Sequence, residues 1–200
     1  MTQIYIVRHG QTDWNLEGRL QGSSNTPLND AGRDQARLAA ASLGDVIRAG
    51  VVVVSSPLDR ARDTADIIAA QWGSEFHTDK RLVERNYGPW EGLSAEEREQ
   101  YDPLQHKAYR AGREPEYEGY ENHASVAARM VAGILEWVEQ APDDLLIVTH
   151  GSSARMAILH LLELAVAGRR IGNLDNASWS RLVQPEGGGW SLDRHNIGAE

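Results

Sequence analysis

The sequence predicts an α/β fold in which helices cover both faces of a mainly parallel sheet, giving three layers of α/β/α. Short apolar runs typical of buried strands alternate along the chain with longer amphipathic segments typical of helices. This alternation is the pattern of parallel sheets. Within 177–196, two strand-like segments flank a glycine-rich turn. This segment predicts an antiparallel hairpin strand that joins the sheet at the C-terminal end of the chain.

Three apolar runs are the predicted parallel strands. They are MTQIYIV at the start of the chain, VVVVSS at 51–56 and DLLIVT at 144–149. The second run is continuously β-branched, as expected for a strand that is buried on both faces.

The helices are predicted from their periodicity and from capping residues. Asn29 is a plausible N-cap for the first long helix, and Gly44 is a plausible stop. Ser56 is a plausible cap for the second, with Pro57 at the first helical position. The predicted helices cover 30–44, 57–72, 124–141 and 152–168.

The length of 200 residues fits a single domain over 1–200. Residues at about 86–122 are polar, aromatic and weakly periodic, and we expect a lid-like excursion from the sheet there. The net charge of -9 argues against binding to nucleic acid or to an anionic membrane. There is no cysteine, no signal-peptide pattern and no apolar run of membrane-spanning length. These features fit a cytoplasmic protein without a membrane partner.

Chemically active side chains follow each of the three predicted strands. Arg8 and His9 follow the first strand, Arg60 lies just after the second, and His150 follows the third. Ligands of open α/β sheets bind beyond the carboxyl ends of the strands, so we expect these side chains to converge. Two histidines and two arginines at one point indicate phosphoryl transfer.

Each of these residues suits one part of that reaction. A neutral imidazole at His9 can attack phosphorus, and nearby arginines would favour the neutral form. Arg8 and Arg60 would hold the phosphoryl oxygens, because guanidinium groups match phosphate geometry and keep their charge. His150 would donate a hydrogen bond to a phosphoryl oxygen and stabilise the transition state.

Other residues complete the predicted site. A helix starting near Gly151 would add backbone N–H groups to the anion pocket. Asn15, Gln21 and Gly22 lie on a loop that would close over the phosphate. Glu84 is the predicted proton donor, because a bound phosphate dianion would favour its protonated form. Glu91 is the alternative, although Trp90-Glu91-Gly92 looks more like a packing turn.

Several other candidates are better explained by structural roles. Arg62 and Asp63 fit a helix surface, and Asp59 fits the first turn of a helix. For Trp14 and Trp90, a place in the core and a place in a substrate wall both stay open. The histidines assigned to structural or surface roles are His77, His106, His123, His160 and His195.

The ordered motifs resemble those of the histidine phosphatase superfamily, also called the phosphoglycerate mutase-like family. They are RHGQTDWN (8–15), GRLQG (18–22), TPLNDAGRDQA (26–36), SSPLDRARDTA (55–65), LVERNYGPWEG (82–92), VTHG (148–151) and NASWSRL (176–182). The resemblance implies that His9 is phosphorylated and that Glu84 is the proton donor. It implies that Arg8, Arg60 and His150 complete the phosphate pocket. It also implies that no metal or other cofactor is needed.

Within this family, the sequence favours a phosphatase over a mutase. The family's cofactor-dependent mutases are generally longer, with a larger basic insertion than 93–122 provides. The family's phosphatases tend to carry a Gly-Glu-Ser element where this chain has Gly119-Tyr120-Glu121-Asn122. In the other direction, the segment starting at Glu84-Arg85 resembles the mutase version of the acid motif. Phosphoglycerate mutase therefore stays open as an alternative, as does an inactive phosphate-binding scaffold.

The predicted substrate is a small phosphorylated metabolite, and the prediction favours a broad-specificity phosphomonoesterase. Glucosyl-3-phosphoglycerate is one candidate substrate, since the NASW element and the overall length resemble phosphatases of such metabolites. Arg85 and Tyr87 are candidates for contacting a substrate carboxylate. Apolar residues on the terminal hairpin leave a homodimer open. Further candidates in the excursion are Lys107, Arg110 and Arg113 for a second anion, and Tyr109, Tyr117 and Tyr120 for the pocket wall.

Overall fold

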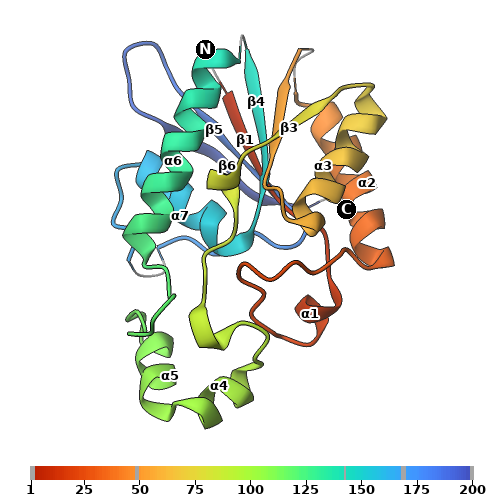
Figure 1. Cartoon of the computed structure of the whole chain (residues 1–200). Coiled ribbons are helices and arrows are strands. Elements are labelled where there is room, and N and C mark those ends of the chain that lie inside the picture. The colour runs from red at the N-terminus through yellow and green to blue at the C-terminus, as the bar shows by residue number, and fades with distance from the viewer. Residues whose placement is uncertain (1–2, 48–49, 142, 168–169, 199–200) are drawn as a thin grey trace.

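The computed structural model describes residues 3–47, 50–141, 143–167 and 170–198 (Figure 1). One six-stranded sheet runs through it in the order β3-β2-β4-β1-β5-β6. The first four of these strands pair in parallel, and β5 and β6 pair antiparallel. The strands are β1 (Gln3–Arg8), β2 (Val52–Ser55), β3 (Phe76–Thr78), β4 (Asp144–Thr149), β5 (Trp179–Val183) and β6 (Ser191–Ile197).

This architecture confirms the predicted three-layer α/β/α fold with an antiparallel C-terminal hairpin. The sequence reading missed β3, which has only three residues and two of them are exposed. A strand so short and so open to solvent leaves no apolar run in the sequence.

Helices cover both faces of the sheet (Figure 1). On β1, Tyr5 and Val7 pack towards the core on the α2 and α3 side, whereas Ile4 and Ile6 belong to the core on the α6 and α7 side. Successive strand residues point to opposite faces, so a strand covered on both sides must be apolar throughout. The helices concerned are α2 (Asp30–Gly44), α3 (Asp59–Trp72), α6 (His123–Gln140) and α7 (Gly151–Leu161).

The capping predictions have mixed outcomes. Asn29 caps α2 as predicted, and its side chain accepts a hydrogen bond from the Gly32 amide. The predicted cap at Ser56 is wrong, because α3 begins at Asp59 after Leu58. The Ser56 hydroxyl instead lies 2.8 Å from His150 Nε2, so it serves the site rather than the helix end.

The helix predicted at 152–168 is shorter in the structure. α7 ends at Leu161, and Glu163 has a left-handed backbone conformation with φ of 56°. Such a conformation cannot continue a right-handed helix. The last predicted residue, 168, lies outside the described residues. α6 differs from its predicted bounds by one residue at each end.

The excursion at about 86–122 is more ordered than its sequence indicated. It holds a 3-10 helix (Gly88–Trp90) and the short α-helices α4 and α5, and it lies beside α1 at the carboxyl end of the parallel strands (Figure 1). Trp90 is fully buried within it, which settles that this side chain is core. Trp14 is only half-buried and lies against Gly92. The rings around Trp90 are His106, Tyr109, Tyr117 and Tyr120, and the short helices are α1 (Asp13–Leu16), α4 (Ala95–Tyr101) and α5 (Pro103–Arg110).

None of the helices in the described part of the chain is long and apolar enough to cross a membrane.

Candidate active site

The carboxyl ends of β1, β2 and β4 meet at one cavity of about 130 Å³. The register of β1 against β4 sets Arg8 opposite Thr149, and the His9 amide donates to the Thr149 carbonyl at 2.9 Å. The residues that follow the two strands therefore lie side by side. The predicted site residues that line this cavity are Arg8, His9, Asn15, Gln21, Gly22, Arg60, Glu84, Tyr87 and Gly151.

His9 and His150 pack against each other beside this cavity, with ring centroids 5.2 Å apart. The His9 Nδ1 atom lies 2.6 Å from the Gly10 carbonyl oxygen. A carbonyl oxygen only accepts, so Nδ1 carries the hydrogen and the Nε2 lone pair is available. Burial, aided by Arg60 and Arg8, holds the pKa of His9 well below its ordinary value. His9 is therefore a neutral imidazole at neutral pH.

His150 is also fully buried and neutral. Burial, together with Arg60 and His9, holds the pKa of His150 well below its ordinary value. The Ser56 hydroxyl accepts from the Leu58 amide and lies 2.8 Å from His150 Nε2. The Nδ1 atom of His150 is buried without a partner among the described residues. When Nδ1 carries the imidazole hydrogen, a ligand oxygen at this point would satisfy it.

Arg60, which is fully buried, and Arg8, which is half-buried, supply the positive charge of the cavity. Arg60 donates to the Gly22 and Ser24 carbonyls at 2.8 and 2.7 Å, and Arg8 donates to the Leu174 carbonyl at 2.7 Å. The Nε atoms of both arginines are buried without partners among the described residues. Burial lowers the pKa of Arg60 to about 10 against the opposing effect of Glu84, so it stays charged at neutral pH. An anion between the two guanidinium groups would complete their hydrogen bonding.

The Glu84 carboxylate reaches the cavity from between the sheet and α7. It accepts hydrogen bonds from the amides of Arg85, Ser152 and Ser153 at 2.9 to 3.0 Å. The Ser153 hydroxyl adds a fourth at 2.8 Å. The expectation that the first turn of α7 offers its N–H groups to the phosphate is therefore wrong for Ser152 and Ser153. Those groups hold the predicted proton donor in place.

The side chain of Glu91 holds the loop that carries Gly22. The Glu91 carboxylate accepts from the amides and hydroxyls of Ser23 and Ser24 and from the Tyr87 amide. Gly22 has φ of 54°, and a Cβ there would lie 2.0 Å from Glu91 Oε1. Only glycine fits that position. Glu91 braces this loop, as its interpretation as a packing turn predicted, rather than lining the cavity.

The side chain of Asn15 is oriented by its neighbours. Its carbonyl oxygen accepts from the Thr12 amide and from Asn176 Nδ2. The amide hydrogens of Asn15 are therefore the groups it can offer to an anion. Residues of the cavity that sequence reasoning did not single out are Arg19, Leu20, Ser152 and Asn173. Arg19 stands in the quoted GRLQG motif, which was the available signal for it.

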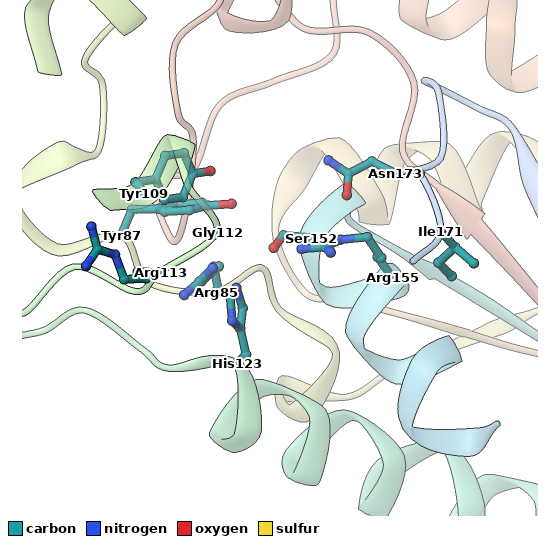
Figure 2. Close-up of a pocket in the computed structure, with 11 residues that line it drawn as sticks. Arg85, Tyr87, Tyr109, Gly112, Arg113, His123, Ser152, Arg155, Ile171 and Asn173 are labelled. Atoms are coloured by element: carbon teal, nitrogen blue, oxygen red, sulfur yellow. The ribbon is translucent and has the colours of Figure 1, made fainter. Parts of the chain in front are cut away.

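A second cavity of about 290 Å³ adjoins the first (Figure 2). The two share Tyr87, Ser152 and Asn173 in their walls. Of the excursion residues predicted to line a pocket, Tyr109 and Arg113 do so. Lys107, Arg110, Tyr117 and Tyr120 are not among its lining residues, and the last two pack around Trp90 instead. The cavity is also lined by Arg85, Gly112, His123, Arg155, Ile171 and Gly172.

Four of the five histidines that were predicted to have structural or surface roles pack against rings, bond a serine or lie on the surface. His77 stacks on Trp137, His106 packs against Trp90, His195 bonds Ser180, and His160 is exposed. His123 differs, because it lines the second cavity. Its place in the sequence gave no signal, since it opens a helix from a turn.

The Gly119-Tyr120-Glu121-Asn122 element joins the excursion to α6. Asn122 caps α6 by accepting from the Ser125 amide. Glu121 forms a two-pronged ion pair with Arg129 at 2.7 and 2.8 Å. Arg129 also donates to the carbonyls of Arg81 and Val83 at 2.7 and 2.8 Å. This pair ties the base of the excursion to the backbone that leads into Glu84.

The comparisons with known proteins agree with this geometry. The model of the histidine phosphatase superfamily (branch 1) matches residues 4–198. A glucosyl-3-phosphoglycerate phosphatase of Mycobacterium tuberculosis is 34% identical over 99% of this chain and 96% of its own length. A probable phosphoglycerate mutase of Yersinia enterocolitica is 35% identical over 96% of this chain and 92% of its own length.

Solved structures agree with the sequence relatives. The mycobacterial glucosyl-3-phosphoglycerate phosphatase in complex with VO3 superposes with a TM-score of 0.88 and 34% identity, covering 98% of this chain and 99% of that one. The chain belongs to the histidine phosphatase superfamily. This confirms the resemblance stated from the motifs and the expectation of an enzyme of the phosphoric monoester hydrolase class.

The Arg129 clamp predicts a loss of stability. Arg129→Met removes the partner of Glu121 and leaves the carbonyls of Arg81, Val83 and Glu84 without this donor. The side chains of Arg129 and Glu121 are 21% and 24% exposed, so we expect the free energy of unfolding to fall by about 1–3 kcal/mol. Urea unfolding measures this, with Arg62→Met as the control on an exposed helix surface. A loss no larger than that of the control would contradict the clamp.

The two buried histidines predict a pH dependence of stability. Their pKa values lie below 6.5 in the folded state, so below that pH the unfolded chain binds more protons. Stability is then present above about pH 6.5 and falls in acid, by up to ~1.4 kcal/mol per pH unit for each histidine. The slope between pH 5 and 6.5 should be shallower in His9→Ala, measured by urea unfolding. An unchanged slope would contradict the buried neutral state.

Proposed function

We propose that the protein hydrolyses phosphomonoesters of small metabolites through a phosphohistidine on His9. In the first step, Nε2 of His9 attacks phosphorus, the ester P–O bond breaks and Glu84 gives its proton to the leaving alkoxide. In the second step, Glu84 takes a proton from water, the water oxygen attacks phosphorus and the P–N bond breaks. Inorganic phosphate leaves and His9 is again neutral.

The single observation that carries this proposal is the state of the buried imidazoles. A neutral His9 with its Nδ1 hydrogen held by a carbonyl presents a lone pair beside two buried, unsatisfied guanidinium Nε atoms. His150 supports it, because its ring packs against that of His9 and its Nδ1 atom, buried without a partner among the described residues, would donate to a phosphoryl oxygen. Such preorganised donors stabilise charge that spreads over the phosphoryl oxygens in the transition state.

We propose further that the reaction needs no metal. Arg8 and Arg60 supply the charge that a metal supplies in other phosphoryl-transfer enzymes. Glu84, the acidic residue that lines the cavity, is held by three amides and a hydroxyl. In keeping with this, the described residues hold no group of three or more histidine or carboxylate side chains placed to bind a metal ion.

For the substrate, we propose glucosyl-3-phosphoglycerate. The name of the Mycobacterium tuberculosis relative supports this, since the match extends over nearly the whole of both chains. The second cavity supports it too. This cavity adjoins the first one, and its volume of about 290 Å³ has room for the rest of such a molecule. A metabolite of this kind also fits the proposed cytoplasmic location.

Phosphoglycerate mutase is the second candidate, favoured by the Yersinia enterocolitica relative. A mutase would use the same residues as the phosphatase. They are Arg8, His9, Arg60, Glu84 and His150. Only the fate of the phosphoryl group separates the two activities. The inactive scaffold has no observation in its favour, since the predicted set is present and oriented for attack.

Phosphate release in the presence of EDTA tests this function directly. The panel holds glucosyl-3-phosphoglycerate, 3-phosphoglycerate, a sugar phosphate and an aryl phosphate, with His9→Ala in parallel. We expect release that EDTA does not reduce, that is greatest with glucosyl-3-phosphoglycerate and that His9→Ala abolishes. Release that stops with EDTA would overturn the metal-free proposal, and interconversion of 2- and 3-phosphoglycerate without release would establish the mutase.

The role of Glu84 predicts a dependence on the leaving group. In Glu84→Gln, turnover of alkyl phosphates should fall by about 10²- to 10⁴-fold, because an alkoxide needs the proton. Turnover of an activated aryl phosphate should fall much less, since a phenolate leaves without protonation. Steady-state kinetics on matched alkyl and aryl substrates measure both. An equal loss on the two classes would show that Glu84 is not the acid.

A further inference from the structure

The NASW element at 176–179 lies beside the phosphate pocket without lining it. The structure describes all four of its residues, and none of them is in the wall of either cavity. The element forms the turn that enters β5, and β5 pairs with β1 so that Trp179 lies opposite Val7. The turn is therefore next to the residues that follow Val7, which are Arg8, His9 and Gly10.

The backbone of this turn is bonded to the start of the loop that carries His9. The Ala177 amide donates to the carbonyls of Arg8 and His9 at 3.0 and 3.1 Å. The Arg8 amide donates to the Ser178 carbonyl at 3.1 Å. Ala177 is buried and has a left-handed backbone conformation, with φ of 56°. Such a conformation is costly for alanine, and it persists where the surrounding contacts enforce it, as they do at many functional sites.

The side chain of Asn176 reaches further into the same loop. Its Nδ2 atom lies 3.1 Å from the His9 carbonyl oxygen and 3.2 Å from the Gly10 carbonyl oxygen. It also lies 3.2 Å from Asn15 Oδ1, an atom that accepts from the Thr12 amide and is therefore an oxygen. One amide group with two hydrogens thus joins three acceptors of the loop.

Two of these acceptors belong to groups that the reaction needs. The Gly10 carbonyl oxygen lies 2.6 Å from His9 Nδ1, and this contact sets the direction of the lone pair on His9 Nε2. Asn15 lines the phosphate pocket, and it can turn its amide hydrogens to an anion only while its oxygen is held on the other side. Asn176 bonds both groups from outside the cavity.

We propose that Asn176 is a positioning residue for phosphoryl transfer, which orients His9 through the Gly10 carbonyl and Asn15 through its side-chain oxygen. The inference rests on the proposed function, in which His9 attacks phosphorus, and adds what holds the nucleophile and a phosphate donor in place. Because Asn176 lies outside the cavity, its replacement changes phosphate binding through Asn15 and the attack through His9. Leucine has nearly the shape of asparagine and lacks the donor.

A double-mutant cycle with Asn15 tests the inference through phosphate affinity. Calorimetry gives the Kd of inorganic phosphate for the wild type, Asn176→Leu, Asn15→Ala and the double variant. We expect Asn176→Leu to raise this Kd by about 10-fold, the loss expected when a hydrogen bond to a charged group is misdirected. In the Asn15→Ala background the same substitution should raise Kd by no more than about 2-fold, because the group that Asn176 orients is absent.

The attack on phosphorus supplies a second readout. With an aryl phosphate, rapid-quench kinetics measure the rate at which the first phosphoryl group reaches His9. We expect this rate to fall by about 10-fold in Asn176→Leu, with or without the Asn15 side chain, because the Gly10 carbonyl loses a donor in both backgrounds.

Asn196→Gly is the matched control. The Asn196 side chain braces the same turn from the other side, where it bonds the amide and the carboxylate of Asp175 at 2.7 and 2.8 Å. Its φ of 54° suits glycine, so the substitution removes these two bonds without straining the backbone. We expect this variant to lose stability and to keep both the phosphate Kd and the rate of phosphorylation.

Equal increases of the phosphate Kd in the two backgrounds would overturn the inference and leave the phosphatase intact. An increase in Asn196→Gly as large as that in Asn176→Leu would do the same, because loosening of the turn would then explain both. If Asn176→Leu does not fold, Asn176→Ala takes its place in the cycle with the same expectations. A wild type that releases phosphate from no ester would overturn the proposed function instead. Phosphate binding needs no turnover, so the cycle would still decide whether Asn176 orients Asn15.

Discussion

The pairing of β1 with β4 is the constraint on which the site depends. Their register is parallel and sets Arg8 opposite Thr149, so the next residue on each strand is a histidine at the same level of the sheet. Neither histidine could be moved by one position without turning its side chain to the other face. β2 pairs on the far side of β4, and Arg60, in the first turn of α3, reaches the same point. The pairing of these strands thus brings Arg8, His9 and Arg60 to one cavity.

Burial then sets the chemistry of these side chains. Burial keeps both imidazoles neutral. The Nε atoms of Arg8 and Arg60 are also buried and have no partners among the described residues, so the cavity favours an anion. Glu84 is held in place at the start of α7 by hydrogen bonds from three backbone amides. Arg129 fixes the backbone leading into Glu84 and, through Glu121, the base of the excursion. Glu84 and the excursion that lines the second cavity are therefore both held by Arg129.

Features that depend on neighbouring residues could be predicted from the sequence, whereas features that depend on residues distant in the sequence could not. The Asn29 cap and the strand-end positions of Arg8, His9 and Arg60 depend on local patterns, and the structure places the cap and the cavity as those patterns predict. Arg155 was missed because a helix residue gives no sign of the cavity it faces until the excursion is placed opposite it. The Ser56 hydroxyl was misassigned to a helix cap because its partner, His150, is 94 residues away. Trp90 stayed undecided for the same reason, as its surrounding rings come from later in the chain.

The measurement that tests the central claim most directly is trapping of the covalent intermediate. The protein is mixed with an activated aryl phosphate, quenched in alkali, where phosphohistidine survives, and digested for mass spectrometry. The account predicts a phosphoryl group on the peptide that contains His9, formed within the first turnover and lost as substrate is exhausted. A phosphoryl group on another residue, or turnover with no phosphorylated peptide at any time, would contradict it.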